Sequence, residues 1–172
     1  MNNRTRKRNR LQTYDYSRAG YYFVTICAHN RVNHFGEIDN DQMKLSGIGQ
    51  IASDCWQDIP EHFENTALDE FVVMPNHIHG IIILVGDADL RPLQQQTAER
   101  SDMYLSKIIH GFKSSVSRII KRRWNDHIFA WQRSFYDHVI RTDESLDDIR
   151  TYINNNPLNW ASDEENPANQ TI

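Results

Sequence analysis

Two histidines separated by one residue give the clearest chemical signal in this chain. They lie in the segment 74–80, which reads MPNHIHG, and the apolar run behind it predicts a strand over residues 77–85. Alternate side chains of a strand face the same side, so His77 and His79 project together, with Cα atoms about 6.6 Å apart. Two imidazoles at that spacing can hold one divalent cation. The alternative interpretation is two surface histidines placed together by chance.

A tyrosine and an asparagine near the end of the chain form a second candidate pair. Tyr152 and Asn156 lie in a predicted helix that begins at Thr142 or Asp143 and ends before Pro157. Residues four apart share one helical face, so a phenol and an amide oxygen would lie side by side there. The pair could supply a nucleophile and a metal ligand. The alternative is a half-buried core tyrosine beside an asparagine that caps the helix.

Positive charge is concentrated in two short blocks, although the net charge is −4. Residues 1–10 and 107–123 contain 11 of the 19 Lys and Arg and no acidic residue, which leaves 8 basic against 23 acidic residues elsewhere. Two basic blocks on an otherwise acidic chain indicate a surface for a polyanion. A solvated tail and a solvated helix face are the alternative.

The elements that must position these residues follow a split β-α-β-β-α-β order. The patterns predict four strands, a small hairpin over 35–45 and amphipathic helices over 46–63 and about 105–124. The strands are expected at 21–28, 68–74, 77–85 and 135–141. This order predicts an α+β, ferredoxin-like antiparallel sheet with helices on one face, the other face free for ligands, and an extra C-terminal helix that carries the tyrosine.

Length and composition limit the remaining possibilities. A chain of 172 residues fits one domain, which we expect over 20–160, with a basic arm at 1–19 and a frayed acidic tail at 161–172. No apolar run is long enough for a membrane span, and no secretory signal is recognisable. Cys27 and Cys55 do not form a metal-type pair, which favours a reducing, cytoplasmic setting.

Three ordered motifs together resemble the single-tyrosine HUH transposases (transposase IS200-like), and within them the REP-associated tyrosine transposases of bacteria. MPNHIHG is followed by WQRSFYDHVIR, from Trp131 to Arg141, and by YINNNPL, from Tyr152 to Leu158. The tripeptide YDY at 14–16 also fits this branch. The resemblance covers about residues 12–167, which is most of the chain.

The resemblance implies a reaction on single-stranded or hairpin DNA with palindromic repeats. In the family, a tyrosine oxygen attacks a backbone phosphorus and forms a 5′-phosphotyrosine link, so that rejoining needs no ATP. The matching motifs make Tyr152 the nucleophile and His77, His79 and Asn156 the ligands of a divalent ion, Mg²⁺ or Mn²⁺. Such an ion would offset the weak nucleophilicity of a phenol at neutral pH. Tyr136 is the rival nucleophile.

The basic blocks then become candidate contacts to DNA phosphates, which supply affinity rather than sequence choice. The predicted DNA-binding residues are Arg4, Arg6, Lys7, Arg8, Arg10, Lys107, Lys113, Arg118, Lys121 and Arg122. The resemblance further implies a nucleoid-associated bacterial protein, either a monomer or a homodimer. Two other functions stay open: a domesticated palindrome-binding protein that no longer cleaves, and a metal phosphodiesterase that uses the histidines without the tyrosine.

Overall fold

A four-stranded antiparallel sheet lies at the centre of the computed structural model, which describes residues 20–85, 101–125 and 128–169, the backbone alone for 101–103. The spatial order of the strands is β4-β5-β1-β6. Their bounds are β1 Gly20–Cys27, β4 Thr66–Val73, β5 His77–Leu84 and β6 Tyr136–Ile140. All four predicted strands are therefore confirmed, with shifts of a few residues at their ends. The predicted basic arm at 1–19, with all five of its predicted DNA-binding residues, lies outside the described residues.

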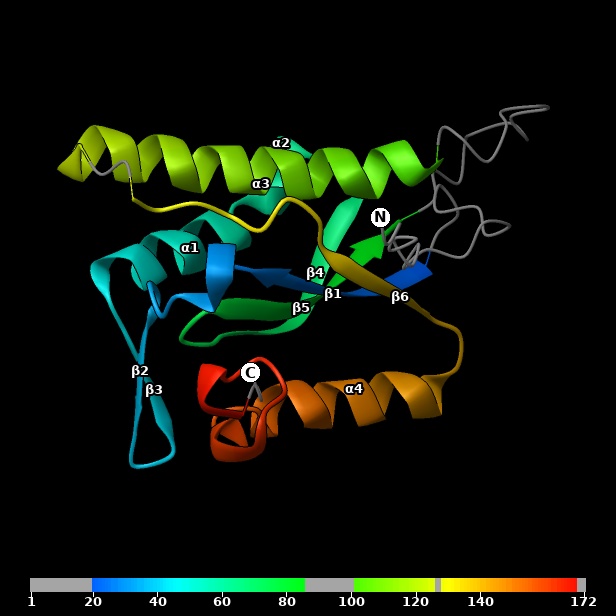
Figure 1. The fold of residues 1–172 in the computed structure, drawn as a ribbon. Helices are drawn as coiled ribbons and strands as arrows, with labels where there is room; N and C mark the ends of the chain where they lie inside the picture. Colours follow the sequence, from blue (N-terminus) through cyan, green and yellow to red (C-terminus); the bar gives the residue numbers. More distant parts are fainter. Residues whose placement is uncertain (1–19, 86–100, 126–127, 170–172) are drawn as a thin grey trace, which may run out of the picture.

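Three helices cover one face of this sheet, as Figure 1 shows for α1 (Gly47–Gln57), α2 (Ile59–His62) and α3 (Ser101–Trp124). The side chains of Tyr22, Val24 and Ile26 alternate toward these helices and are fully buried in the main hydrophobic cluster. Burial of apolar area in this cluster is the main stabilising contribution to the fold.

The prediction of a single helix over 46–63 is wrong for its second half. The helix begins as expected, because the Ser46 hydroxyl accepts a hydrogen bond from the Gly49 N–H at 3.0 Å. It ends at Gln57, and the short helix α2 follows with Pro60 in its first turn. Proline has no N–H to donate and is tolerated only in the first turn of a helix, so the chain restarts there.

The opposite face of the sheet is also covered, which corrects the expectation of a free ligand face. Helix α4 (Asp143–Asn155) lies across it, on the far side of the sheet from α3 (Figure 1). A second apolar cluster of Ile81, Ile140, Leu146 and Ile153 joins the helix to the strands. The Arg150 guanidinium adds two hydrogen bonds of 2.9 and 2.6 Å to the Asp69 carboxylate of β4.

The C-terminal segment is folded, so the predicted frayed tail is wrong for residues 161–169. Two short 3₁₀ turns, η2 (Trp160–Ser162) and η3 (Pro167–Asn169), return the chain to the start of β5, where the Asn76 amide donates to the Glu165 carbonyl (2.8 Å). Asparagine side chains tie these turns together, because Asn166 Nδ2 donates to the Trp160 carbonyl (2.9 Å) and Asn169 Nδ2 to the Ala161 carbonyl (2.8 Å). Such local side-chain bonds offer the backbone an alternative to a regular helix.

A small hairpin, β2 (Gly36–Asp39) and β3 (Gln42–Leu45), forms a separate two-stranded sheet, as the sequence predicts. Its turn residues Asn40 and Asp41 both have positive φ, which suits a primed hairpin turn. Both cysteines are buried and free. Among the described helices, none has the length and apolarity needed to cross a membrane.

Candidate active site

Strand β5 places both motif histidines beneath helix α4. They face the same side of the sheet, as predicted, but they are buried, with His77 fully inaccessible and their ring centroids 4.4 Å apart. Gly80 explains part of the motif, because a Cβ there would lie 2.3 Å from the Trp56 ring. A glycine lets Trp56 pack directly against β5 on the face opposite the histidines, and this packing holds the strand in position.

The Nδ1 atom of each imidazole has a hydrogen-bond partner. His77 Nδ1 lies 2.9 Å from Asn76 Oδ1, and His79 Nδ1 lies 2.9 Å from Thr25 Oγ1 on the neighbouring strand β1. Because Asn76 Oδ1 can only accept, His77 carries its proton on Nδ1. Its Nε2 is consequently a bare lone pair, and it is buried without a partner in the described structure. Partners of this kind orient metal-binding histidines.

Both histidines are electrically neutral at pH 7. Burial lowers the pKa of His79 to about 3. Burial also lowers the pKa of His77 well below its usual value, and electrostatic repulsion of a second proton by His79 and Arg31 lowers it further. A metal ligand must be unprotonated, so this burial prepares both rings for an ion.

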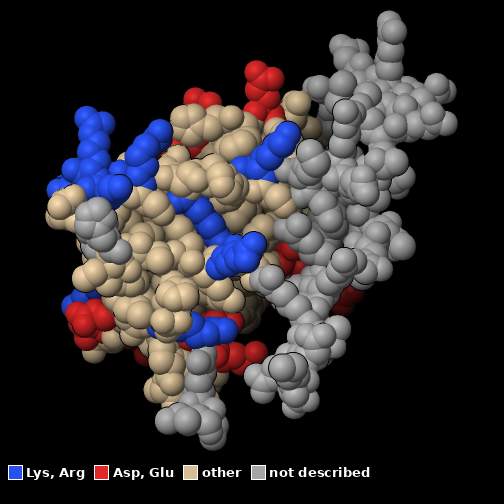
Figure 2. Space-filling view, turned by 45° about the horizontal axis from the view of Figure 1, so that its top comes forward, with Lys and Arg blue, Asp and Glu red and all other residues tan. Residues whose placement is uncertain are grey.

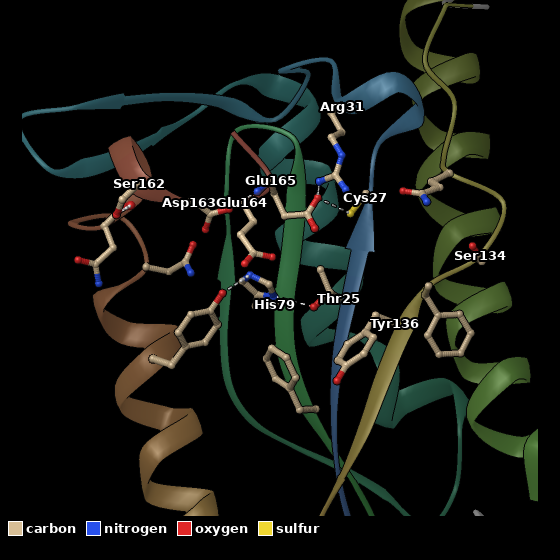
Figure 3. A pocket seen from close by; sticks show the side chains of 16 residues that line it. Thr25, Cys27, Arg31, His79, Ser134, Tyr136, Ser162, Asp163, Glu164 and Glu165 are labelled. Carbon is tan, nitrogen blue, oxygen red and sulfur yellow. Dashed lines mark hydrogen bonds and ion pairs between the residues drawn. The ribbon is translucent and has the colours of Figure 1, made fainter. Parts of the chain in front are cut away.

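Helix α4 and its C-cap bring Tyr152 and Asn156 into the pocket that His79 lines; Figure 3 is a close view of this pocket. The Tyr152 hydroxyl lies 3.2 Å from His79 Nε2, and the two ring centroids are 5.3 Å apart. The Asn156 amide hydrogen-bonds to Tyr152 and to Asp163, whereas its Oδ1 is buried without a partner. The four residues predicted from two distant motifs thus meet in one place.

Asp163 is a member of the site that the sequence reading missed. Its carboxylate and the nitrogens of His77 and His79 include ligand atoms that all lie within 4.8 Å of one another. Burial raises the pKa of Asp163, while Asn156 and Arg31 act to lower it. The available signal is the acidic run 163–165, eight residues beyond the end of the tyrosine helix, in the segment that the sequence predicts to be a frayed tail.

These residues fit a divalent cation. Two unpartnered, buried polar atoms, His77 Nε2 and Asn156 Oδ1, face no protein donor, and a cation would satisfy both. With His79 and Asp163 they form a mixed nitrogen and oxygen donor set, which suits Mn²⁺ or Mg²⁺ better than thiolate-binding metals.

The tyrosine is held in its protonated form while no cation is near. Burial raises the pKa of Tyr152, the Asp163 and Glu164 charges raise it further, and the hydrogen bond from Asn156 lowers it. A cation beside the phenol would favour the phenolate instead. The pocket therefore contains a potential nucleophile whose activation depends on positive charge.

The pocket around Tyr152 has a volume of about 690 Å³ and reaches from α4 to the chain before β6. Its wall includes Ser134, Phe135 and the rival tyrosine, Tyr136, whose side chain is 45 % exposed. Position alone therefore does not exclude Tyr136. The distinction is that Tyr152, unlike Tyr136, contacts His79 and shares its helix with Asn156.

The predicted phosphate-binding residues of α3 lie on the other side of the sheet. Figure 2 shows lysines and arginines gathered over this part of the surface. The exposed predicted members are Lys107, Arg118, Lys121 and Arg122. Lys113 differs, because its ammonium donates to the carbonyls of Gln132 (2.8 Å) and Ser134 (3.3 Å), and burial lowers its pKa to about 8. The structure therefore gives Lys113 a role in attaching the loop before β6.

Comparison with known proteins identifies a family and several relatives of this chain. The family model described as "Transposase IS200 like" matches residues 16–156. An uncharacterised protein of Haemophilus influenzae is 39 % identical in an alignment of 168 positions that covers 92 % of each chain. Another protein of that organism, named "Putative REP-associated tyrosine transposase", is 26 % identical over 84 % of this chain and 73 % of its own.

A solved structure of a REP-associated tyrosine transposase bound to a REP hairpin has the same fold, with a TM-score of 0.56 at 20 % identity over 81 % of this chain and 67 % of that one. The family match covers the strand that carries the histidines and the helix that carries the tyrosine. This chain accordingly belongs to the IS200-like transposase family.

Proposed function

We propose that this protein is a metal-dependent nuclease and strand transferase that cuts and rejoins single-stranded DNA through a 5′-phosphotyrosine intermediate at Tyr152. The observation that carries the proposal is the 3.2 Å contact between the Tyr152 hydroxyl and His79 Nε2, beside two unpartnered buried ligand atoms. A nucleophile next to a candidate metal centre is the arrangement this reaction requires.

In the proposed reaction the Tyr152 oxygen forms a bond to a backbone phosphorus and the bond from that phosphorus to the 3′ oxygen breaks. The phenol loses its proton, and the departing 3′ oxygen gains one. His77, His79, Asn156 and Asp163 would hold the divalent ion, Mg²⁺ or Mn²⁺, whose charge polarises the phosphate. Asn156 also orients the phenol through its amide hydrogen bond. Rejoining reverses the bond exchange without an energy source.

The proposed substrate is a DNA hairpin with a single-stranded flank, in line with the hairpin in the related solved structure. The exposed α3 side chains would contact the phosphates of the stem. The flank would then pass over residues 132–136, because Lys113 of α3 binds the Gln132 carbonyl and Ser134 to Tyr136 line the pocket. One chain supplies all the proposed ligands and the nucleophile, so the reaction needs no residue from a second copy.

A denaturing gel with end-labelled hairpin DNA and Mn²⁺ tests the proposal. The hairpins come from palindromic repeats, and the 3′-labelled and 5′-labelled forms are run in parallel. The wild-type chain should give a covalent band that retains the 3′-labelled fragment, because the protein becomes joined to the 5′ phosphate. Tyr152→Phe should give no such band while it binds the hairpin within about threefold, since only the attacking oxygen is removed.

Tyr136→Phe is the matched control, because it removes a hydroxyl from the same pocket. It should still form the covalent band. A covalent band with Tyr152→Phe and none with Tyr136→Phe would identify Tyr136 as the nucleophile. Hairpin binding without any covalent band from the wild-type chain would instead identify a domesticated binding protein.

A further inference from the structure

Arg31 is a cation of the pocket that the proposed reaction does not yet use. It is the single Lys or Arg among the described residues that line the pocket with His79, Tyr152 and Asn156. The same wall contains three carboxylates, those of residues 163–165. A phosphodiester that enters such a pocket meets net negative charge, so any cation that can turn toward it has a large effect.

The backbone holds Arg31 in an uncommon conformation. Asn30 and Arg31, just beyond β1, have φ of 52° and 53°, in the left-handed region that non-glycine residues seldom adopt. Strained backbone of this kind persists where the surrounding structure enforces it, and it is frequent at functional sites.

Asn76 supplies part of that enforcement and connects it to the candidate metal centre. Its Nδ2 donates to the Arg31 carbonyl at 3.1 Å, and its Oδ1 accepts from His77 Nδ1 at 2.9 Å. One fully buried amide therefore fixes both the chain that presents the guanidinium and the ring that would bind the ion. The Arg31 backbone and the His77 ring are thereby held in a fixed relation to each other, while the Arg31 side chain can still turn.

The present partner of Arg31 indicates what it can bind. Its guanidinium forms an ion pair with the Glu165 carboxylate, next to Cys27 (Figure 3). A carboxylate and a phosphate both present two oxygens to the fork of an arginine. The charge of Arg31 also reaches the site, because it contributes to lowering the pKa of both His77 and Asp163.

We propose that Arg31 binds a nonbridging oxygen of the scissile phosphate, exchanging Glu165 for the DNA. The assignment rests on the proposed function and makes Arg31 a catalytic residue of that reaction. The competing explanation is structural: Arg31 anchors Glu165 so that Asp163 reaches the histidines. The catalytic and structural explanations differ in one consequence. If Arg31 serves only as an anchor, removing Arg31 and removing Glu165 should slow the reaction equally.

The first experiment measures the rate of covalent adduct formation with a hairpin that the wild-type chain cleaves. Arg31→Gln should slow the reaction about 100-fold or more, in the range for loss of one preorganised charged donor. Arg31→Lys should recover part of this rate, and Glu165→Gln should keep at least the wild-type rate. Equal losses for Arg31→Gln and Glu165→Gln would overturn the assignment in favour of the anchor.

The second experiment measures binding to uncut DNA in the Tyr152→Phe background. Replacing the mapped scissile phosphodiester with a neutral methylphosphonate should weaken binding about tenfold or more, as expected for a charged hydrogen bond. In Tyr152→Phe with Arg31→Gln, the same replacement should have little further effect. If the two changes weaken binding independently, so that their fold-losses multiply, the assignment is overturned. A wild-type chain that forms no adduct overturns the proposed function itself, whereas a normal adduct with independent losses overturns only the role of Arg31.

Discussion

The outer surface of α3 and the pocket beneath α4 lie on opposite sides of one sheet and carry opposite charge. Residues 107–123 contain six basic and no acidic residues, whereas the described wall of the pocket contains three carboxylates and one arginine. The basic surface suits long-range, sequence-independent attraction of phosphates. The pocket disfavours a phosphate until a cation is present. Affinity and chemistry are therefore separated in space, and each should be lost without loss of the other.

Removing the histidine ligands should abolish metal binding in the pocket and leave DNA binding by the basic surface unchanged. His77→Gln combined with His79→Gln should lower Mn²⁺ affinity more than 100-fold, because two nitrogen ligands are lost, a larger change than the 10- to 100-fold typical of their supporting partners. Hairpin affinity should stay within about threefold. Calorimetry with Mn²⁺ and a fluorescence binding assay measure the two quantities. Because both rings are buried, circular dichroism must first show that the variant is folded. Unchanged Mn²⁺ affinity in a folded variant would contradict the metal assignment.

Acid should destabilise the metal-free protein through the same two rings. The unfolded chain protonates an imidazole near pH 6.5, but folded His79 takes its proton only near pH 3. This contribution to stability is thus present above pH 6.5 and is lost as the pH falls toward 3. One such ring changes the free energy of unfolding by at most about 1.4 kcal/mol per pH unit, or about thirtyfold in the folding equilibrium between pH 6.5 and 5.

Urea unfolding of chelator-treated protein at several pH values measures this effect. The raised pKa of Asp163 works in the opposite direction, because that carboxyl takes up its proton earlier in the folded state. The variant with both histidines replaced by glutamine is the control, and its stability should depend less on pH over this range. An identical slope in the two proteins would show that the buried rings do not cause it.

Neutralising one carboxylate of the pocket should distinguish a ligand from general negative charge. Asp163→Asn should lower Mn²⁺ affinity about tenfold, since a ligand oxygen loses its charge. Glu164→Gln removes the same charge from the same pocket but leaves the cluster of His77, His79 and Asp163 intact, so affinity should change less than threefold. Calorimetry compares both variants. Equal losses would mean that only the net charge of the pocket matters.

Removing single charges from α3 should have the smallest effect and should act on binding alone. Lys121→Gln should reduce the slope of log affinity against log salt by about 0.7 to 0.9 and weaken hairpin binding about fourfold at 0.15 M salt. Adduct formation at saturating DNA should not change. Lys44→Gln, on the hairpin away from α3, is the control and should keep the wild-type slope. A slower adduct at saturation would contradict the separation of the two regions.

The sequence was most informative where the geometry is local. A strand repeats every two residues, so His77 and His79 had to face one side, and a helix repeats every 3.6 residues, so Tyr152 and Asn156 had to share a face. The Ser46 cap and the β2–β3 turn follow from similar short-range rules. Even the break after Gln57 could have been read from Pro60.

Local periodicity carries no information about what covers a face. The histidines lie beneath α4 because Ile149 and Ile153 pack against strands far away in the sequence, a contact that depends on how the whole chain folds. The predicted open ligand face was wrong for this reason.

The remaining members of the site were decided by tertiary structure alone. Thr25 reaches His79 across 54 residues because β1 and β5 pair in the register Thr25 to His79. Asp163 reaches the site through turns held by asparagine side chains, so that part of a stretch predicted as a frayed tail joins the cluster of His77 and His79. A side chain's type and period determine what chemistry it can do and which way it points. Strand register and long-range packing determine which other groups it meets, because those depend on the free energy of the whole fold.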